Sequence, residues 1–247
     1  METETQLNDG IFEGLFPRGR LASAFTELEN LNPARSEHPE LSAAECRFYA
    51  GLRFEKRRRD WLGGRLAAKR AVVRLAESSG ADWRPQSTRE VEVLAGTTRE
   101  PRVYSPGSGI PRRVQVSISH SGQLAGAVAC HADAGRIGFD LERLESIEPA
   151  LYRLAFCDSE AEAIESTPAA TRVDAAVTLW TAKEAVSKAI GTGLSICLRD
   201  IHLSWPSGFC RGSHRQRFSA LVQPDGLHLG VDTCRIGDYV LSLAWLE

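Results

Sequence analysis

The 247-residue sequence has no long apolar run, no closely spaced cysteine pair and no strong net charge. No segment approaches the roughly 18 apolar residues that indicate a membrane-spanning helix, and the first residues, Met1–Glu4, are acidic where a secretory signal peptide is basic. We therefore expect a cytoplasmic protein that does not bind membranes. Because the formal net charge is −2, the composition gives no general attraction for nucleic acid, and any polyanion site has to be local.

The six cysteines are scattered and form no C-x-x-C pair, so the sequence gives no support for a zinc ribbon or a redox motif. We expect them to be small, reduced hydrophobic residues rather than a disulfide framework. The hydrophobic content of 43% and the charged content of 25% are those of an ordinary globular protein. The length allows one large domain or two smaller ones.

The run from Leu179 to Gly193 is the most informative stretch. Its apolar residues recur at helical spacing, which places Glu184 and Lys188 on a neighbouring face, and Gly191 is suited to the end of the helix. A carboxylate and an ammonium group on one face suit the binding of a metal-bound phosphate. The alternative is an exposed i, i+4 ion pair, which contributes only about 0.3–0.5 kcal/mol.

A second stretch, Arg136–Glu142, alternates in the manner of a β-strand. Three apolar residues share one face, which places Asp140 and Glu142 together on the other. Two carboxylates at this spacing repel each other, and Mg²⁺ is a natural compensating cation because it binds carboxylate oxygens. The alternative is the exposed polar face of an antiparallel strand.

Basic residues suited to phosphate occur at two further places. The segments Val114–Ser119 and Leu124–Ala129 predict a β-hairpin with His120 at its tip, although a histidine at such a tip is often an ordinary surface residue. The run Lys56–Arg59 lies at the start of a helix predicted over residues 54–77. Such a run is usually a solvated face, yet a guanidinium group is well shaped to hold a phosphate.

The other expected elements follow from capping and alternation patterns. Ser42 and Glu45 form a capping-box pattern that predicts a helix to about residue 49. A helical pattern covers residues 151–166, with Asp158 or Ser159 as an internal N-cap candidate. Five further strands are predicted, the first of them at a sheet edge, over residues 91–94, 201–204, 218–222, 227–231 and 239–244.

A faint internal repeat appears when Trp61 is aligned with Trp180, which places Lys69 opposite Lys188. In both copies a long helix precedes a hairpin that ends in a small apolar strand. The repeat predicts two similar α+β halves that join near residues 135–136, and the seam between such halves is a common place for a ligand site. Chance similarity is the alternative explanation.

Three ordered motifs together resemble the 4′-phosphopantetheinyl transferases: Ser117–Ser121, Gly138–Glu142 and Trp180–Gly191. The resemblance is to the longer, surfactin-synthetase-activating (Sfp) type, and the first helix is similar to its siderophore-synthesis branch. It implies an α+β pseudo-dimer in which each half packs a long helix on a small antiparallel sheet, with the active site in the seam. Residues 1–136 would contain the histidine hairpin and the coenzyme A phosphate contacts, and residues 137–247 the metal-binding carboxylates and the catalytic helix.

The resemblance implies transfer of the 4′-phosphopantetheine arm of coenzyme A to a serine of an apo acyl, peptidyl or aryl carrier protein. The by-product is adenosine 3′,5′-bisphosphate. Such a Mg²⁺-dependent enzyme, of the holo-[acyl-carrier-protein] synthase type, activates carriers for nonribosomal peptide, polyketide or siderophore biosynthesis. An internal pseudo-dimer also suggests that the protein is a monomer, with no nucleic-acid partner.

Residue by residue, the resemblance assigns Mg²⁺ binding to Asp140, Glu142 and Glu184 and catalysis to Glu184 and Lys188. It assigns contacts with the coenzyme to Arg59, His120, Lys183 and Lys188. Whether Glu184 is a base, a metal ligand or both stays open, and so does the choice among Arg57, Arg58 and Arg59. Many relatives have Gly-Lys-Pro where this chain has Arg99–Arg102, so the contacts of that loop are open as well.

Two alternatives belong to other functional classes. One is a non-catalytic module that binds coenzyme A or a carrier protein, and the other is an unrelated metal-dependent phosphohydrolase. A transfer assay with and without carrier protein distinguishes the three.

Overall fold

The computed structural model describes residues 11–12, 15–17, 19–35, 38–79, 83–97, 99–108, 111–145, 147–191, 196–204 and 215–246. The chain consists of two compact units, Met1–Ala134 and Gly135–Glu247. Gly193 and Cys210 lie outside the described residues. Within the described part of the chain, none of the helices combines the length and the apolar character that crossing a membrane requires.

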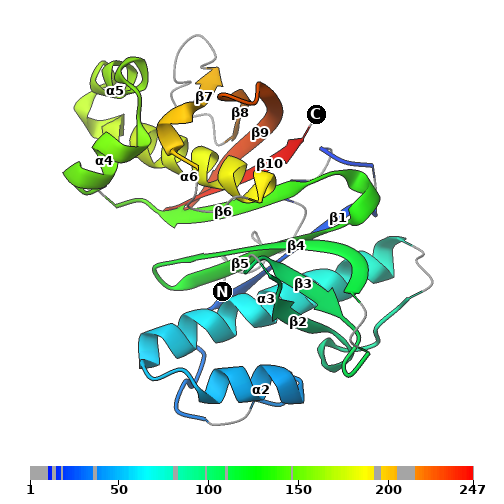
Figure 1. The fold of residues 1–247 in the computed structure, drawn as a ribbon. Coiled ribbons are helices and arrows are strands. Elements are labelled where there is room, and N and C mark those ends of the chain that lie inside the picture. The colour runs from blue at the N-terminus through cyan, green and yellow to red at the C-terminus, as the bar shows by residue number, and fades with distance from the viewer. Residues whose placement is uncertain are drawn as a thin grey trace. The chain divides into compact units, whose positions relative to one another are not determined.

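The first unit is built on a five-stranded antiparallel sheet crossed by one long helix (Figure 1). The strand order is β1-β5-β4-β3-β2. The long helix α3 packs on this sheet, and its buried side forms the core with the sheet. The elements are β1 (Leu21–Glu27), α2 (Ala43–Ala50), α3 (Glu55–Ser79), η1 (Thr88–Glu90), β2 (Glu92–Ala95), β3 (Pro101–Tyr104), β4 (Pro111–Ser121), β5 (Leu124–His131) and η2 (Ala132–Ala134).

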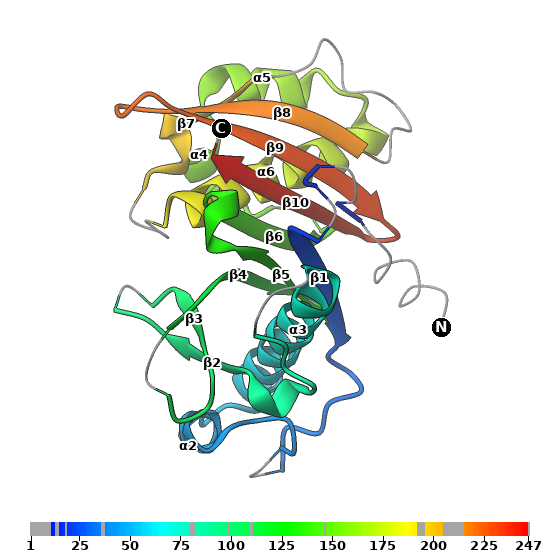
Figure 2. The same cartoon turned by 90° about the vertical axis from the view of Figure 1, so that its right-hand side faces the viewer.

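The second unit repeats this plan, with the strand order β6-β10-β9-β8-β7 in a second antiparallel sheet (Figure 2). Its long helix α6 packs on that sheet, and the core lies between the two. The elements are β6 (Ile137–Arg143), α4 (Pro149–Ala155), α5 (Asp158–Glu165), η3 (Ala169–Thr171), α6 (Arg172–Ile190), η5 (Leu198–Asp200), β7 (Ile201–Ser204), β8 (Arg215–Val222), β9 (Leu227–Ile236) and β10 (Tyr239–Leu246).

The two units share the strand order of their sheets and a long helix after the first strand, and the second unit adds the helix α4; the expected α+β fold with two similar halves is confirmed. In each, the first strand pairs with the last, and the last four strands follow the long helix. The boundary between the two units lies between Ala134 and Gly135. The functional roles expected of the two halves stay predictions.

The caps of the helices show how local sequence sets their limits. The capping box predicted at Ser42 and Glu45 is present, with the Ser42 hydroxyl accepting from the Glu45 amide and the Glu45 carboxylate accepting from the Ser42 amide. Helix α6 ends at Gly191, whose φ of 81° is in the left-handed region that glycine adopts without strain. Both helix limits were readable from sequence.

Two expectations about the second unit and the N-terminal region were wrong or incomplete. The pattern over residues 151–166 forms two helices, because Phe156 is extended between α4 and α5. The N-cap of α5 is Cys157, whose amide donates to the Glu160 carboxylate at 3.0 Å. Strand β1 was not predicted at all, because its short sequence lies among glycines and prolines that favour loops.

The alignment that placed Lys69 opposite Lys188 has the wrong register. Lys69 and Lys183 are the equivalent residues, since each is fully buried in the long helix and is paired with the first-turn glutamate of the short helix just before it. The two tryptophans that anchored the alignment differ in surroundings. Trp61 stacks on Phe48 with ring centroids 5.2 Å apart, whereas Trp180 packs against the core of the second unit.

Candidate active site

A glycine lets strand β6 approach helix α6 very closely. A Cβ atom added to Gly138 would lie 2.0 Å from the Ala185 carbonyl oxygen and 2.3 Å from the Ala189 amide nitrogen. Any larger side chain would therefore push the strand and the helix apart. Asp140 lies two residues further along the strand, on the same face as Gly138, and it is therefore directed toward α6.

Asp140 and Lys188 form an ion pair between this strand and the helix. The Lys188 ammonium nitrogen lies 2.6 Å from the Asp140 Oδ1 atom, with the two side chains 28% and 4% exposed. A charge-assisted hydrogen bond of this length is among the stronger polar contacts in a protein. This contact holds the Lys188 side chain on a partly solvent-exposed part of α6.

Glu184 lies one helical turn before Lys188, on the same face of α6, and is half-buried. Burial raises the pKa of the Glu184 carboxyl above its usual range, the Asp140 carboxylate raises it further, and Lys188 opposes the shift. These influences show that the structure brings together two carboxylates and one ammonium group. Such a trio has one negative charge in excess when all three groups are ionised.

Glu142 is two residues beyond Asp140 on β6, on the same face of the strand, and it is half-buried. In the described part of the chain, no three His, Cys, Asp or Glu residues are grouped closely enough to hold a metal ion. The structure therefore does not gather Asp140, Glu142 and Glu184 into a complete ligand set. The chemistry of the donors nevertheless suits Mg²⁺, because carboxylate oxygens are its preferred protein ligands and the facing Asp140 and Glu184 would be relieved by a cation.

Lys183 points into the interior of the second unit and is fully buried. Its ammonium group lies 2.5 Å from the Glu160 Oε2 atom, and it also donates to the carbonyl oxygens of Ala155 at 2.8 Å and Leu198 at 3.0 Å. Burial lowers the pKa of Lys183, and the Glu160 carboxylate opposes that shift. With three acceptors inside its own unit, Lys183 ties α6 to the end of α4, to α5 and to η5.

The two residues predicted from the first unit are both accessible. Arg59 is 32% exposed and pairs with Glu55 one turn earlier on α3, at 2.8 Å. His120 is exposed on β4, where it pairs with Ala125 of β5 beside the hairpin turn. Both contacts with the coenzyme stay predictions.

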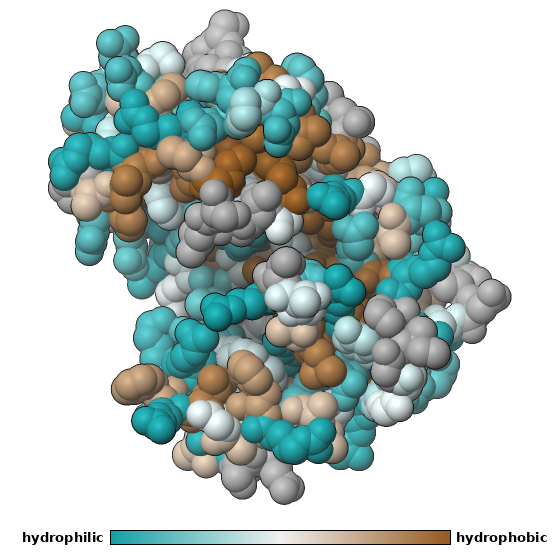
Figure 3. Space-filling model, viewed as in Figure 1, coloured by the Kyte–Doolittle hydropathy of each residue, from teal (hydrophilic) through white to brown (hydrophobic). Residues whose placement is uncertain are grey.

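Arg58, the neighbour of Arg59, packs on an aromatic ring. Arg58 lies over the ring of Tyr49 at 4.5 Å and donates to the Arg35 carbonyl oxygen, which makes it less available to a ligand. Phe48 and Phe54 are 52% and 73% exposed. In Figure 3, tan and brown atoms lie among teal atoms over α2 and the adjoining end of α3.

The corresponding face of the first unit has different chemistry. Asp140 and Ala24 are each the fourth residue of the first strand of their units. With Lys69 equivalent to Lys183, Glu184 corresponds to Arg70 and Lys188 to Arg74. The paired carboxylates are therefore a property of the second unit, although both units share one topology.

Sequence reasoning missed the roles of Glu160 and Gly138. No role of its own was assigned to Glu160, and its partner Lys183 was expected to contact the phosphates of the coenzyme. The only sequence signal was that a capping-box pattern precedes the long helix in both halves, with a glutamate in the third helical position each time.

The fold and the site define an α+β unit whose long helix presents a carboxylate and an ammonium group beside a strand aspartate. Residues 136–244, which include this helix and strand, match the model of the 4′-phosphopantetheinyl transferase superfamily. Over these residues the chain is similar to that superfamily. Among curated proteins, none matches the sequence.

Solved structures of holo-(acyl-carrier-protein) synthases are similar to part of the chain. The enzyme from Bacillus anthracis, in complex with CoA (3′,5′-ADP), is 20% identical over 45% of this chain and 95% of its own, with a TM-score of 0.36. The enzyme from Thermotoga maritima is 20% identical over 57% and 76%, with a TM-score of 0.36. The enzyme from Mycobacterium tuberculosis is 22% identical over 46% and 96%, with a TM-score of 0.34.

Proposed function

We propose that this protein transfers the 4′-phosphopantetheine arm of coenzyme A to a serine hydroxyl of an apo acyl, peptidyl or aryl carrier protein. The observation that carries the proposal is the association of Asp140, Glu184 and Lys188 inside the superfamily-matched unit. The presence of two units of one topology in a single chain supports the longer, Sfp type. The proposal includes the cytoplasm as location and a monomer as the working form.

In this reaction the serine oxygen of the carrier attacks the phosphorus that bears the pantetheine arm, and adenosine 3′,5′-bisphosphate leaves. Glu184 is suited to accept the serine proton, because a half-buried carboxylate with a raised pKa is a stronger base than an exposed one. Lys188, held by Asp140 at 2.6 Å, is suited to offset the negative charge that develops on the transferred phosphate. Asp140 therefore orients Lys188.

Asp140, Glu142 and Glu184 would hold Mg²⁺. When bound, the cation neutralises charge on the pyrophosphate oxygens and so assists departure of the leaving phosphate. Glu184 then serves as ligand, as base, or in both roles. In each of these roles its carboxylate has to be ionised.

Four residues are proposed to contact the coenzyme: Arg59, His120, Lys183 and Lys188. The exposure of Arg59 and His120 supports a direct contact with phosphate. For Lys183, the three acceptors in its own unit support an indirect role, in which it orients α6.

A carrier panel tests the proposal. The purified protein is incubated with apo acyl, peptidyl or aryl carriers, coenzyme A and Mg²⁺, and the intact mass of each carrier is measured. We expect at least one carrier to gain the mass of one phosphopantetheine arm, and no gain with any carrier would contradict the proposal. Binding of coenzyme A without transfer would favour a non-catalytic module, and phosphate release without a carrier would favour a phosphohydrolase.

Two isosteric variants test the named groups. Asp140→Asn and Glu184→Gln should each lower the transfer rate by about 10²-fold or more, the range for loss of a general base or a charge-stabilising group. Glu162→Gln is the matched control, because Glu162 is an exposed glutamate on α5 of the same unit. A near-normal rate in either test variant would remove that residue from the mechanism.

A further inference from the structure

The first unit contains a cavity of about 270 Å³, and none of the residues proposed for transfer lines it. It lies between α3 and the end of the β4–β5 hairpin that is remote from the turn, where Val114 pairs with His131. His120 is six residues beyond Val114 on β4. At about 3.3 Å per residue, the two positions are about 20 Å apart along the strand.

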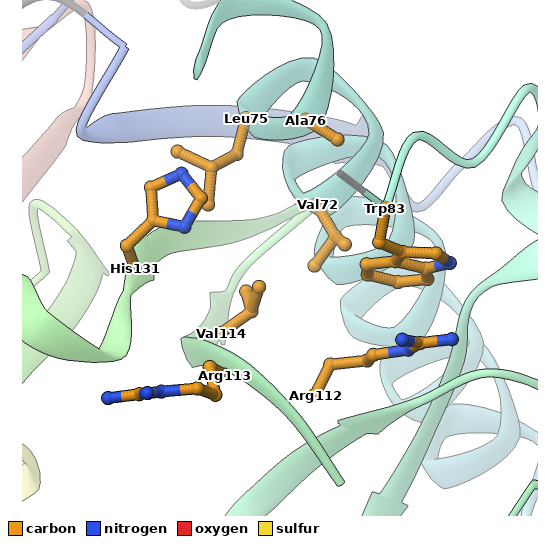
Figure 4. Close-up of a pocket in the computed structure, with 8 residues that line it drawn as sticks. All are labelled: Val72, Leu75, Ala76, Trp83, Arg112, Arg113, Val114 and His131. Carbon is orange, nitrogen blue, oxygen red and sulfur yellow. The ribbon is translucent and has the colours of Figure 1, made fainter. Parts of the chain in front are cut away.

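The floor of the cavity is apolar and its ends are basic (Figure 4). Val72 of α3 and Val114 of β4 lie between the two ends, and Leu75 of α3 lies on the side of His131. Trp83 and Arg112 lie at one end of the cavity, and Arg113 and His131 lie at the other.

Arg112 is held in place by its neighbours. The centre of its guanidinium group lies 4.8 Å from the centroid of the Trp83 ring, and its Nε atom donates to the Ser105 hydroxyl at 3.0 Å. Its Nη2 atom donates to the same hydroxyl, so this edge of the stacked guanidinium group is already occupied. Arg113 is exposed beside the cavity. Neither arginine has an ion pair with a carboxylate among the residues that the structure describes, so both keep their charge for an anion.

We propose that this cavity binds a small aromatic carboxylate. The ring would pack on Val72, Leu75 and Val114, and the carboxylate would accept hydrogen bonds from the guanidinium group of Arg113. The volume is slightly below the range of roughly 300–1,000 Å³ for sites of drug-sized ligands. A single ring with one carboxylate fits such a space.

Benzoate is the probe that tests the proposal, and benzamide is its uncharged counterpart of nearly equal shape. Binding to the full chain is measured by ligand-observed NMR and by titration calorimetry. We expect saturable benzoate binding at millimolar concentration, with affinity for benzamide lower by about tenfold or more, because a charged acceptor makes the stronger bond to arginine. Absence of saturable benzoate binding, or equal binding of benzamide, would overturn the proposal.

Three variants locate the site. Arg113→Gln should weaken benzoate binding about tenfold, and Ala76→Leu, which adds volume at a buried position in the cavity wall, should prevent it. Arg53→Gln is the matched control, an exposed arginine of the same unit that does not line the cavity. Circular dichroism shows whether each variant is folded. Benzoate affinity that is unchanged in both Arg113→Gln and a folded Ala76→Leu variant would refute this site.

Discussion

Replacing Lys183 by methionine tests whether this lysine is a structural residue or a direct contact of the coenzyme. The substitution keeps the length and apolar stem of the side chain but removes the ammonium group. Glu160, which is 6% exposed, would then be buried without its cation, and the Ala155 and Leu198 carbonyl groups would each lose a donor. Removing one partner of a buried ion pair typically costs about 3–5 kcal/mol.

That cost is a large part of the roughly 5–15 kcal/mol by which domains are stable. We expect urea denaturation, followed by circular dichroism, to show a loss of this size for Lys183→Met. Adding Glu160→Gln removes the stranded charge, and the new amide oxygen can still accept from the Cys157 amide. The double variant should therefore recover stability, with a coupling free energy of about 1–3 kcal/mol between the two sites.

Lys56→Met is the control, because the Lys56–Asp60 pair joins an 81%-exposed lysine to its partner one turn away. Its cost should be at most about 0.5 kcal/mol. A Lys183→Met variant as stable as the Lys56→Met control would refute the structural role. Coenzyme A affinity is then measured on the folded double variant: an affinity equal to that of the parent would exclude a direct contact between Lys183 and the coenzyme.

Four further predictions concern other parts of the structure. Lys69→Met should destabilise the first unit by about 3–5 kcal/mol, because Glu45 is equally buried, and equal urea midpoints for variant and parent would contradict this. Gly138→Ala should cost about 1–3 kcal/mol and slow transfer, because the added Cβ displaces α6 from β6; unchanged stability and rate would be the opposing result. Burial raises the pKa of Cys130 and of Cys234 to about 12, so both should resist iodoacetamide at pH 8 while exposed Cys197 reacts, as peptide mass mapping would show. Because unfolded thiols ionise near pH 9, these two cysteines should lower the free energy of unfolding as the pH rises from about 9 to 12, and a Cys130→Ala variant should lose part of that slope.

The elements that the sequence predicted well are those with a strong local signal. The capping box at Ser42, the long helices and the hairpin around His120 follow from periodicity, capping residues and turn residues over short distances. The carboxylates at Asp140 and Glu142 were placed on one face because alternation along a strand is strict. These inferences require no knowledge of distant contacts.

The arrangements that the sequence did not reveal depend on partners far apart in the chain. Nothing local distinguishes Lys183 from Lys188, since both are lysines on one helix, yet one is fully buried and the other partly exposed. Their environments depend on Glu160 in one case and on Asp140 in the other. The register of the internal repeat was wrong for the same reason. The alignment matched Trp61 with Trp180, whereas the equivalence of Lys69 and Lys183 is visible only from their buried ion pairs.

The ion pair of Lys183 and Glu160 also fixes the rotational setting of α6 about its axis. Successive residues of an α-helix are about 100° apart around that axis. With the Lys183 ammonium held by three acceptors on one side, the direction of Glu184 is fixed, and so is that of Lys188. An inserted or deleted residue between Lys183 and Lys188 would turn Lys188 by about 100° relative to the buried pair and away from Asp140. The buried pair therefore sets the orientation of α6 independently of the residues on its exposed face. Those residues can be substituted while the orientation of the helix stays the same.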